Sequence, residues 1–258
     1  MTTWQGVDTH VHLSTYADPD AELAASIEVG VRLVSGTILA SEYRQQRQHF
    51  GADTEALQLG LGIHPLHAEL GSLDEELELL TEEFAGARWI SEIGLDGFFD
   101  REGLASLPRQ RHVLEAIFSL GVSDRLLSVH SRDAEVETID RLLDAVPGAV
   151  VLHWFDGSPA VAARGADAGW YFSVNSFMIA SPRHVELLQW LPTDRLVTET
   201  DGPTTTMPDG RPCRPLHVVE IADRLAEIRG ADPRELRRRL VENMDRLEAS
   251  VPPLSCRS

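Results

Sequence analysis

Short apolar runs of strand character alternate along the chain with segments in which apolar residues recur at helical spacing. The two periods distinguish strands from helices, because side chains repeat every two residues in a strand and every 3.6 in a helix. The pattern predicts eight strands. They are expected at residues 6–13, 31–39, 57–64, 88–96, 126–131, 149–155, 170–175 and 196–201.

Helices are expected between these strands and after the last one. Asp232 and Pro233 have the residue types of an N-cap and a first helical position. Eight strands alternating with helices predict a (β/α)8 TIM barrel, whose typical size is about 250 residues. An open doubly wound sheet is the alternative, but no glycine-rich dinucleotide turn is present. The expected helices are residues 20–29, 72–84, 108–120, 133–145, 158–168, 181–190, 214–229 and 232–249.

The composition fits one globular domain over residues 1–258, because 43% of the residues are hydrophobic and no low-complexity tract interrupts the pattern. The first residues lack a basic region followed by an apolar core, and no segment approaches the roughly 18 apolar residues of a membrane span. Cys213 and Cys256 lie far apart and form no Cys-x-x-Cys pair. We therefore expect a cytoplasmic protein with no membrane partner.

The chain is strongly acidic, with 23 Lys and Arg against 41 Asp and Glu and a net charge of −18. Proteins that track long duplex DNA usually carry a basic face, since phosphate neutralisation supplies most of that affinity. A nucleic-acid substrate would therefore need a local site where cations and a few arginines reverse the sign. The alternative is that the acidity only maintains solubility.

Six polar residues stand in or near the ends of predicted strands, where a (β/α)8 barrel has its active site. His10 and His12 would share one face of the first strand. Each of the six alone has an ordinary interpretation as a hydrogen-bonded buried residue. Together they favour a metal site, because uncompensated buried polar groups cost several kcal/mol each. The six are His10, His12, Glu92, His130, His153 and Asp201.

This set of donors suits two divalent ions of the kind that lie about 3.5–4 Å apart in two-metal hydrolases. One ion would bind His10, His12 and Asp201, and the other His130 and His153, with Glu92 bridging. Nitrogen and oxygen donors without thiolate favour Zn²⁺, Mn²⁺, Fe²⁺ or Co²⁺ over Ca²⁺. The large number of imidazoles disfavours Mg²⁺, but Mg²⁺ is kept among the candidate ions. Such ions activate water for attack on an electrophile, and the Asp201 carboxylate could accept the proton.

The motifs around these residues resemble those of the TatD family of metal-dependent deoxyribonucleases, which belongs to the amidohydrolase-like barrels. The resemblance implies a TIM barrel, two divalent metals at the six residues above, and hydrolysis of DNA, often from 3′ to 5′ on single strands. It also implies that His64 contacts phosphate, as a catalytic and substrate-binding residue. The motifs are Asp8-Thr9-His10-Val11-His12, Gly62-Ile63-His64-Pro65, Glu92-Ile93-Gly94-Leu95-Asp96, His130-Ser131-Arg132-Asp133-Ala134, His153-Trp154-Phe155-Asp156-Gly157-Ser158 and Glu199-Thr200-Asp201-Gly202-Pro203.

Three arginines are candidate phosphate contacts. Arg132 directly follows a predicted ligand motif, and its guanidinium offers a planar fork of donors; the alternative is an ion pair with Asp133 or Asp156. Arg211 and Arg214 lie in a loop after Asp201 that departs from the TatD pattern, so the choice of substrate stays open. The divergent loop also resembles the QatD-like component of bacterial anti-phage systems, which implies defence-system proteins as partners.

Other functions remain compatible with the same residues. Metal-activated water does not dictate its electrophile, so a small-molecule amidohydrolase or a deacylase of charged tRNA is an alternative enzyme class. A defence-complex interaction subunit with a structural metal site is the non-catalytic alternative. Within the nuclease hypothesis, Phe98 and Phe99 either stack a terminal base or have a role in the core or in a lid.

Overall fold

The computed structural model describes residues 4–254 and divides into two compact units. The first unit contains the described part of Met1–Ser35, together with Asp53–Gln58 and Ser158–Arg246. The second contains Gly36–Ala52, Leu59–Gly157 and the described part of Leu247–Ser258. That the chain is a single domain stays a prediction.

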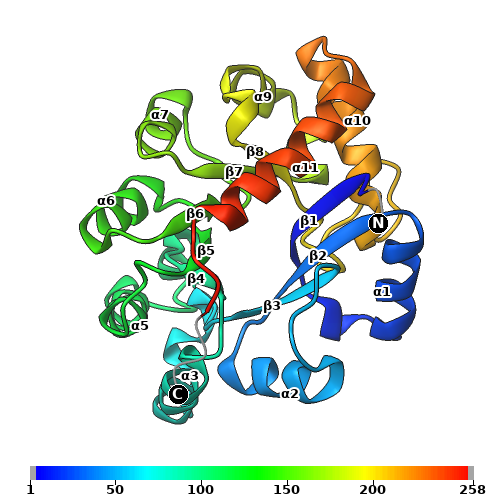
Figure 1. Cartoon of the computed structure of the whole chain (residues 1–258). Helices are drawn as coiled ribbons and strands as arrows, with labels where there is room; N and C mark the ends of the chain where they lie inside the picture. The colour runs from blue at the N-terminus through cyan, green and yellow to red at the C-terminus, as the bar shows by residue number, and fades with distance from the viewer. Residues whose placement is uncertain (1–3, 255–258) are drawn as a thin grey trace. The chain divides into compact units, whose positions relative to one another are not determined.

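The first unit is built on four strands, with β8 and β1 at its centre. β7 (Tyr171–Val174) pairs in parallel with β8 (Leu196–Thr198), and β1 (Gly6–Val11) pairs in parallel with β2 (Val31–Gly36). The Thr198 hydroxyl donates to the carbonyl of Val7 at 2.6 Å and so ties β8 to β1. Its helices are α1 (Pro19–Glu28), α7 (Pro159–Asp167), α8 (Ser176–Ala180), α9 (Val185–Trp190), α10 (Val218–Arg229) and most of α11 (Pro233–Ala249). In Figure 1, α10 lies beside β1.

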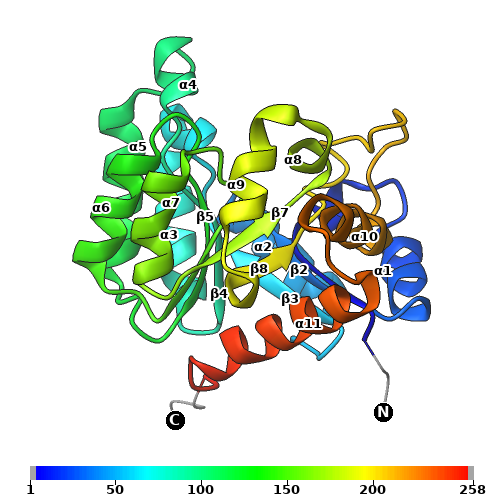
Figure 2. The same ribbon diagram turned by 90° about the horizontal axis from the view of Figure 1, so that it is seen from above.

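The second unit contains β4 (Trp89–Gly94), β5 (Leu126–His130) and β6 (Ala149–Leu152), with most of β3 (Leu57–Leu61). These strands pair in parallel in chain order. Figure 2 shows α4 at one end of this unit, beyond α5. Its helices are α2 (Ala40–Phe50), α3 (Leu73–Phe84), α4 (Gly97–Arg101), α5 (Leu107–Ser119) and α6 (Glu135–Ala145).

Strand order in the sheet follows chain order from β1 to β8, and helices alternate with the strands. This is the arrangement of a (β/α)8 barrel, so the predicted fold class is confirmed. The strands are buried along nearly their whole length, as the continuous apolar runs indicated. Within residues 4–254, no helix is both long and apolar enough to cross a membrane.

Candidate metal centre

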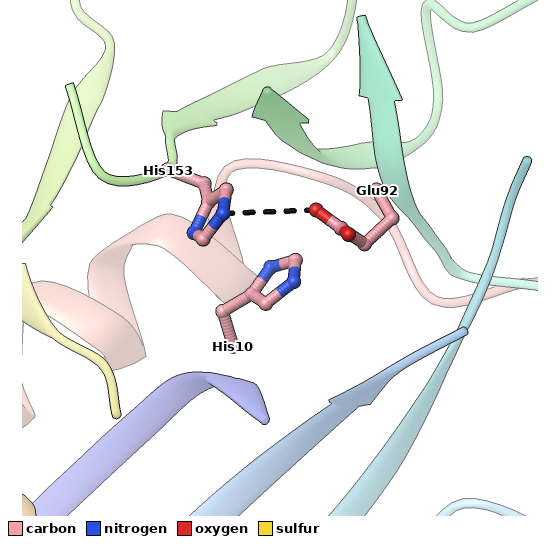
Figure 3. A group of neighbouring side chains, drawn as sticks. All are labelled: His10, Glu92 and His153. Carbon is pink, nitrogen blue, oxygen red and sulfur yellow. Dashed lines mark ion pairs between the residues drawn. The ribbon is translucent and has the colours of Figure 1, made fainter. Parts of the chain in front are cut away.

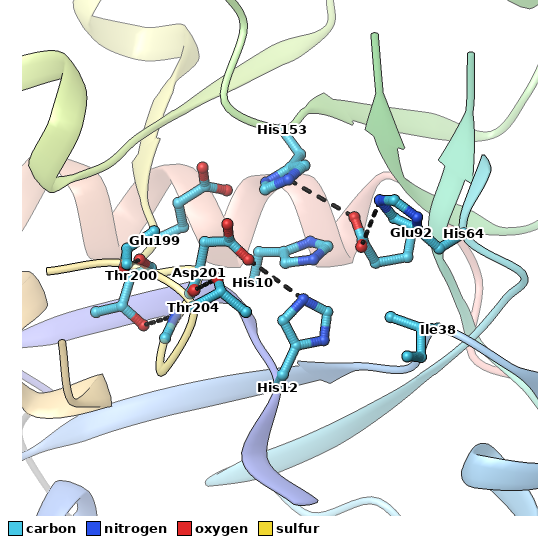
Figure 4. Close-up of polar contacts among 12 residues, drawn as sticks. His10, His12, Ile38, His64, Glu92, His153, Glu199, Thr200, Asp201 and Thr204 are labelled. Carbon is cyan, nitrogen blue, oxygen red and sulfur yellow. Dashed lines mark hydrogen bonds and ion pairs between the residues drawn. The ribbon is translucent and has the colours of Figure 1, made fainter. Parts of the chain in front are cut away.

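Three of the predicted ligands meet in the first unit, and we call His10, His12 and Asp201 the His10 group. Their ligand atoms all lie within 4.8 Å of one another, and all three side chains are buried. Nε2 of His12 lies 3.2 Å from Oδ1 of Asp201 (Figure 4). The structure thus brings together the residues predicted to share one ion.

Backbone hydrogen bonds fix the position of this group. The N–H of Asp201 donates to the carbonyl of His10 at 2.9 Å, and the N–H of His12 donates to the carbonyl of Gly202 at 2.9 Å. The segment after β8 is therefore tied to the end of β1 on both sides of the ligands. These backbone bonds keep the side chains of the His10 group near one another, and they do not involve the side-chain atoms that would bind a metal.

Asp8 adds a buried link between the same two segments. Its carboxylate accepts hydrogen bonds from the backbone N–H of Thr200 at 2.9 Å and from the Thr200 hydroxyl. Burial raises the pKa of Asp8 well above its usual range, although the hydrogen bonds from Thr200 oppose this shift. Nearby, Glu199 accepts a hydrogen bond from the Asn175 amide at 3.1 Å. Both carboxyl groups support the segment that carries Asp201.

The remaining predicted ligands meet in the second unit with His64, and we call His64, Glu92, His130 and His153 the Glu92 group. Ligand atoms of the first three lie within 4.8 Å of one another. Oε2 of Glu92 lies 3.5 Å from Nε2 of His64, and Oε1 lies 3.6 Å from Nε2 of His153 (Figures 3 and 4). One buried carboxylate therefore faces several imidazoles, which is a donor set for a cation.

Hydrogen bonding determines which nitrogen of His64 carries the proton. Its Nδ1 accepts the backbone N–H of Leu66 at 3.1 Å, so the neutral ring carries its proton on Nε2. That Nε2 is the nitrogen directed at Glu92. His64 is therefore equipped to donate a hydrogen bond at the Glu92 group.

The backbone is irregular where the ligands lie. The register of β1 with β2 shifts between Asp8 and Val11, and that of β4 with β5 shifts between Ile90 and Ile93, so His10 and Glu92 lie in bulged segments. Glu92 has φ of 57° and Asp201 has φ of 50°, in the left-handed region that side chains other than glycine rarely adopt. Strain of this kind, typically about 1–3 kcal/mol per residue, is concentrated at functional sites.

Asp96, to which the sequence motifs assigned no role, lies against a predicted ligand. Oδ2 of Asp96 lies 2.7 Å from Nε2 of His130, and the carboxylate is fully buried. Burial alone would raise the pKa of Asp96, but hydrogen bonding to His130 and the charges nearby lower it below its usual value. The sequence feature that could have indicated a role is the position of Asp96 just after β4, the strand that contains Glu92.

The three candidate phosphate-binding arginines differ in their contacts. Arg132 is exposed, and its guanidinium carbon lies 4.0 Å above the ring centroid of Phe98, whereas Asp133 pairs with Arg101 at 2.6 Å. Arg211 lies between two carboxylates, at 2.7 Å from Asp209 and 2.8 Å from Glu220. Arg214 pairs with Glu22 at 2.9 Å. The guanidinium of Arg132 thus lies over the uncharged Phe98 ring, while those of Arg211 and Arg214 form ion pairs with carboxylates.

The chemistry of both groups fits divalent ions of borderline softness. Each group combines imidazole nitrogens with a carboxylate, and neither contains a thiolate. Cys213 is buried and its thiol lies 3.5 Å from the Ser176 hydroxyl, and Cys256 lies outside the described residues.

Comparison with known proteins decides the family. The TatD related DNase family model matches residues 7–249. The chain belongs to the TatD related DNase family.

Membership confirms the resemblance and the predicted enzyme class, a hydrolase. The 3′-5′ ssDNA/RNA exonuclease TatD of Citrobacter rodentium is 29% identical, over 89% of this chain and 91% of the relative. The human deoxyribonuclease TATDN3 is 27% identical, over 89% of each chain. The crystal structure of YJJV, a TatD homolog from Escherichia coli, matches with a TM-score of 0.82 and 27% identity, covering 96% of this chain and 99% of that one.

Proposed function

We propose that this chain hydrolyses phosphodiester bonds of DNA with bound divalent ions, as an exonuclease on single-stranded ends. The observation that carries the proposal is the pair of groups that each combine imidazoles with a buried carboxylate, Asp201 in one and Glu92 in the other. Relatives named deoxyribonuclease and ssDNA/RNA exonuclease support the class of substrate.

In this proposal the His10 group holds one ion, and Glu92, His130 and His153 hold a second. The bridging position of Glu92, the number of ions and the choice among Zn²⁺, Mn²⁺ and Mg²⁺ stay predictions. When bound, the ions supply Lewis acidity, which lowers the pKa of water toward neutrality and neutralises charge on the phosphate. The left-handed backbone at Glu92 and Asp201 supports the assignment, since the surrounding structure must maintain this strain.

The proton and the phosphate need separate partners in this reaction. The Asp201 carboxylate is the proposed acceptor of the proton that the attacking water releases. His64 is the proposed donor to a phosphate oxygen, because its Nδ1 accepts from Leu66 and its proton is on Nε2. In this proposal Asp201 acts as the base and His64 acts as the hydrogen-bond donor.

Arg132 is the proposed phosphate contact that offsets the acidity of the chain. Its guanidinium carbon lies 4.0 Å above the Phe98 ring centroid, and the planar group offers a fork of hydrogen-bond donors that suits phosphate. Arg211 and Arg214 would first have to leave Asp209, Glu220 and Glu22, so we expect them to contribute less. Anti-phage defence, partner proteins and a cytoplasmic location stay predictions.

A substrate panel tests this function. The purified protein, supplied with Zn²⁺, Mn²⁺ or Mg²⁺, is incubated with single-stranded and duplex DNA labelled at either end, and separately with a charged tRNA and small amide substrates. Stepwise shortening of single-stranded DNA that stops with chelator and returns with metal is the expected result. Ester or amide hydrolysis without DNA cleavage would favour the alternative enzyme class. Inactivity on every substrate, with a co-purifying partner, would favour the interaction subunit.

A further inference from the structure

Asp96 uses both oxygens of its carboxylate within the second unit. Oδ1 accepts the backbone N–H of Phe99 at 2.9 Å and so caps α4, while Oδ2 lies 2.7 Å from Nε2 of His130. The side chain is fully buried. A carboxylate with two short contacts in a dry environment has little freedom to reorient.

The Gln110 side chain holds the backbone of Asp96. Its Oε1 accepts the Asp96 N–H at 2.6 Å, and its Nε2 donates to the carbonyls of Asp96 and Ala105 at 2.9 and 2.7 Å. Gln110 is itself buried, on α5. Three hydrogen bonds from one side chain hold the turn before α4 in a single conformation.

Backbone contacts fix the distance between this turn and His130. The N–H of Leu95 donates to the carbonyl of His130 at 3.1 Å, and the N–H of Gly97 donates to the carbonyl of Arg132 at 2.9 Å. A Cβ on Gly94 would lie 1.9 Å from the His130 carbonyl oxygen, so only glycine permits this approach. The segment that carries Asp96 and the segment that carries His130 are therefore held together by backbone contacts and cannot shift independently.

We propose that Asp96 is a positioning residue that holds His130 as the tautomer with its proton on Nε2, so that Nδ1 is the nitrogen that binds the ion. A carboxylate offers only acceptors, so the 2.7 Å contact requires an N–H on Nε2. Carboxylate partners of this kind orient metal-binding histidines and raise their basicity. The inference rests on the proposed metal site.

The hydrogen bonds also divide the roles of two histidines in the Glu92 group. His130 donates from Nε2 and keeps Nδ1 as an acceptor, whereas His64 accepts at Nδ1 and keeps its proton on Nε2. An imidazole binds a metal through its unprotonated nitrogen. His130 is accordingly the proposed ligand of the two, and His64, whose Nε2 lies 3.5 Å from Oε2 of Glu92, is the proposed hydrogen-bond donor.

Nitrogen NMR of the histidine rings tests the tautomer directly in the wild-type protein. The chain is labelled with ¹⁵N-histidine, its ring signals are recorded before and after addition of Zn²⁺, and His130 is identified from the His130→Gln variant. We expect a protonated Nε2 in both states and a Zn²⁺-induced shift at Nδ1. A protonated Nδ1 with Zn²⁺ at Nε2 would overturn the role of Asp96 while leaving the metal site intact. No response of either nitrogen would instead refute His130 as a ligand, and with it the proposed second ion.

The Asp96→Asn variant measures the effect on metal binding. Asparagine retains an oxygen for the Phe99 N–H but lacks the charge, so we expect Zn²⁺ affinity, measured by competition with a chelator, to fall about 10–100-fold for one ion. Asp100→Asn is the matched control, because Asp100 is an exposed residue of α4 that accepts the N–H of Leu107. Equal Zn²⁺ affinity in Asp96→Asn and wild type, with both folded, would contradict the proposal. If Asp96→Asn does not fold, the wild-type NMR measurement still decides.

Discussion

Nε2 of His12 lies 3.2 Å from Oδ1 of Asp201, although one residue follows β1 and the other follows β8. Both side chains are buried, and the backbone of each segment hydrogen bonds to the other. This pairing places an imidazole and a carboxylate together where strands β1 and β8 end. A cation bound there would gain two different ligands from one rigid junction.

Asp201→Asn is expected to weaken metal binding at the His10 group. The amide lacks the negative charge that a divalent ion requires, and we expect a loss of more than about 100-fold in affinity, since outer-shell partners alone typically cost 10–100-fold. Metal content of the purified protein, measured by elemental analysis, checks this. Asp194→Asn is the matched control, because Asp194 is exposed and precedes β8. Full metal content in Asp201→Asn would remove this residue from the ligand set.

Arg132→Ala is expected to raise the KM for single-stranded DNA about tenfold, as the loss of one charge-assisted hydrogen bond implies. The salt dependence of binding should flatten by about 0.7 in the slope of log K against log salt, the value for one phosphate contact on a single strand. Initial rates of DNA degradation give KM, and fluorescence anisotropy at several salt concentrations gives the salt dependence of binding. Arg211→Ala should change KM less, because its ion pairs with Asp209 and Glu220 compete with phosphate. An unchanged slope in Arg132→Ala would exclude a phosphate contact at this position.

Gly94→Ala is expected to destabilise the protein by about 3 kcal/mol or more, through a steric clash and an unfavourable φ. The added Cβ would lie 1.9 Å from the His130 carbonyl oxygen, and φ is 139°. Gly71→Ala is the control, because no atom lies within 4 Å of a Cβ there. Urea denaturation followed by circular dichroism compares the two. Equal midpoints for the two variants would show that the approach of β4 to β5 is not constrained by Gly94.

Glu137→Gln is expected to change the stability of the second unit in a pH-dependent way. Hydrogen bonds from Arg111, at 2.6 and 2.8 Å, and from Arg141 hold the pKa of Glu137 at about 2, below its usual 4.5. A depressed carboxyl pKa contributes stability above the unfolded-state value, and this contribution is lost as the pH falls toward 2. The stability difference between wild type and Glu137→Gln should therefore be largest above pH 4.5 and shrink below it. Thermal melts between pH 7 and pH 3 measure it, with Asp144→Asn on the same helix as control; a difference that grows on acidification would contradict the sign.

The strand starts could be predicted from the apolar runs, but the strand ends could not. The expected strand at residues 196–201 ends as β8 at Thr198, and the one at 149–155 ends as β6 at Leu152, so Asp201 and His153 lie beyond the paired segments. Period-two alternation cannot detect the bulges near His10 and Glu92 or the left-handed backbone at Glu92. These irregularities depend on tertiary contacts, which the local pattern does not contain.

Three helices were missed for related reasons. α2 is largely polar and buries Ala40, Tyr43 and Gln46, so its apolar spacing is weak, while α4 and α8 have only five residues each. The donor residues of the site stay a prediction from the strand-end motifs, and the structure brings these residues together within each unit. Asp96 received no role because its contact with His130 depends on the turn that Gln110 fixes.

The central claim is that the buried carboxylate of Glu92 is needed both for metal and for DNA hydrolysis. The most direct test measures metal content and degradation of end-labelled single-stranded DNA on the same preparations of wild type, Glu92→Ala and Glu75→Ala, the last an exposed glutamate of α3. We expect wild type and Glu75→Ala to retain both properties, and Glu92→Ala to lose metal and activity together. A Glu92→Ala protein that loses its metal but degrades DNA at the wild-type rate would contradict the account.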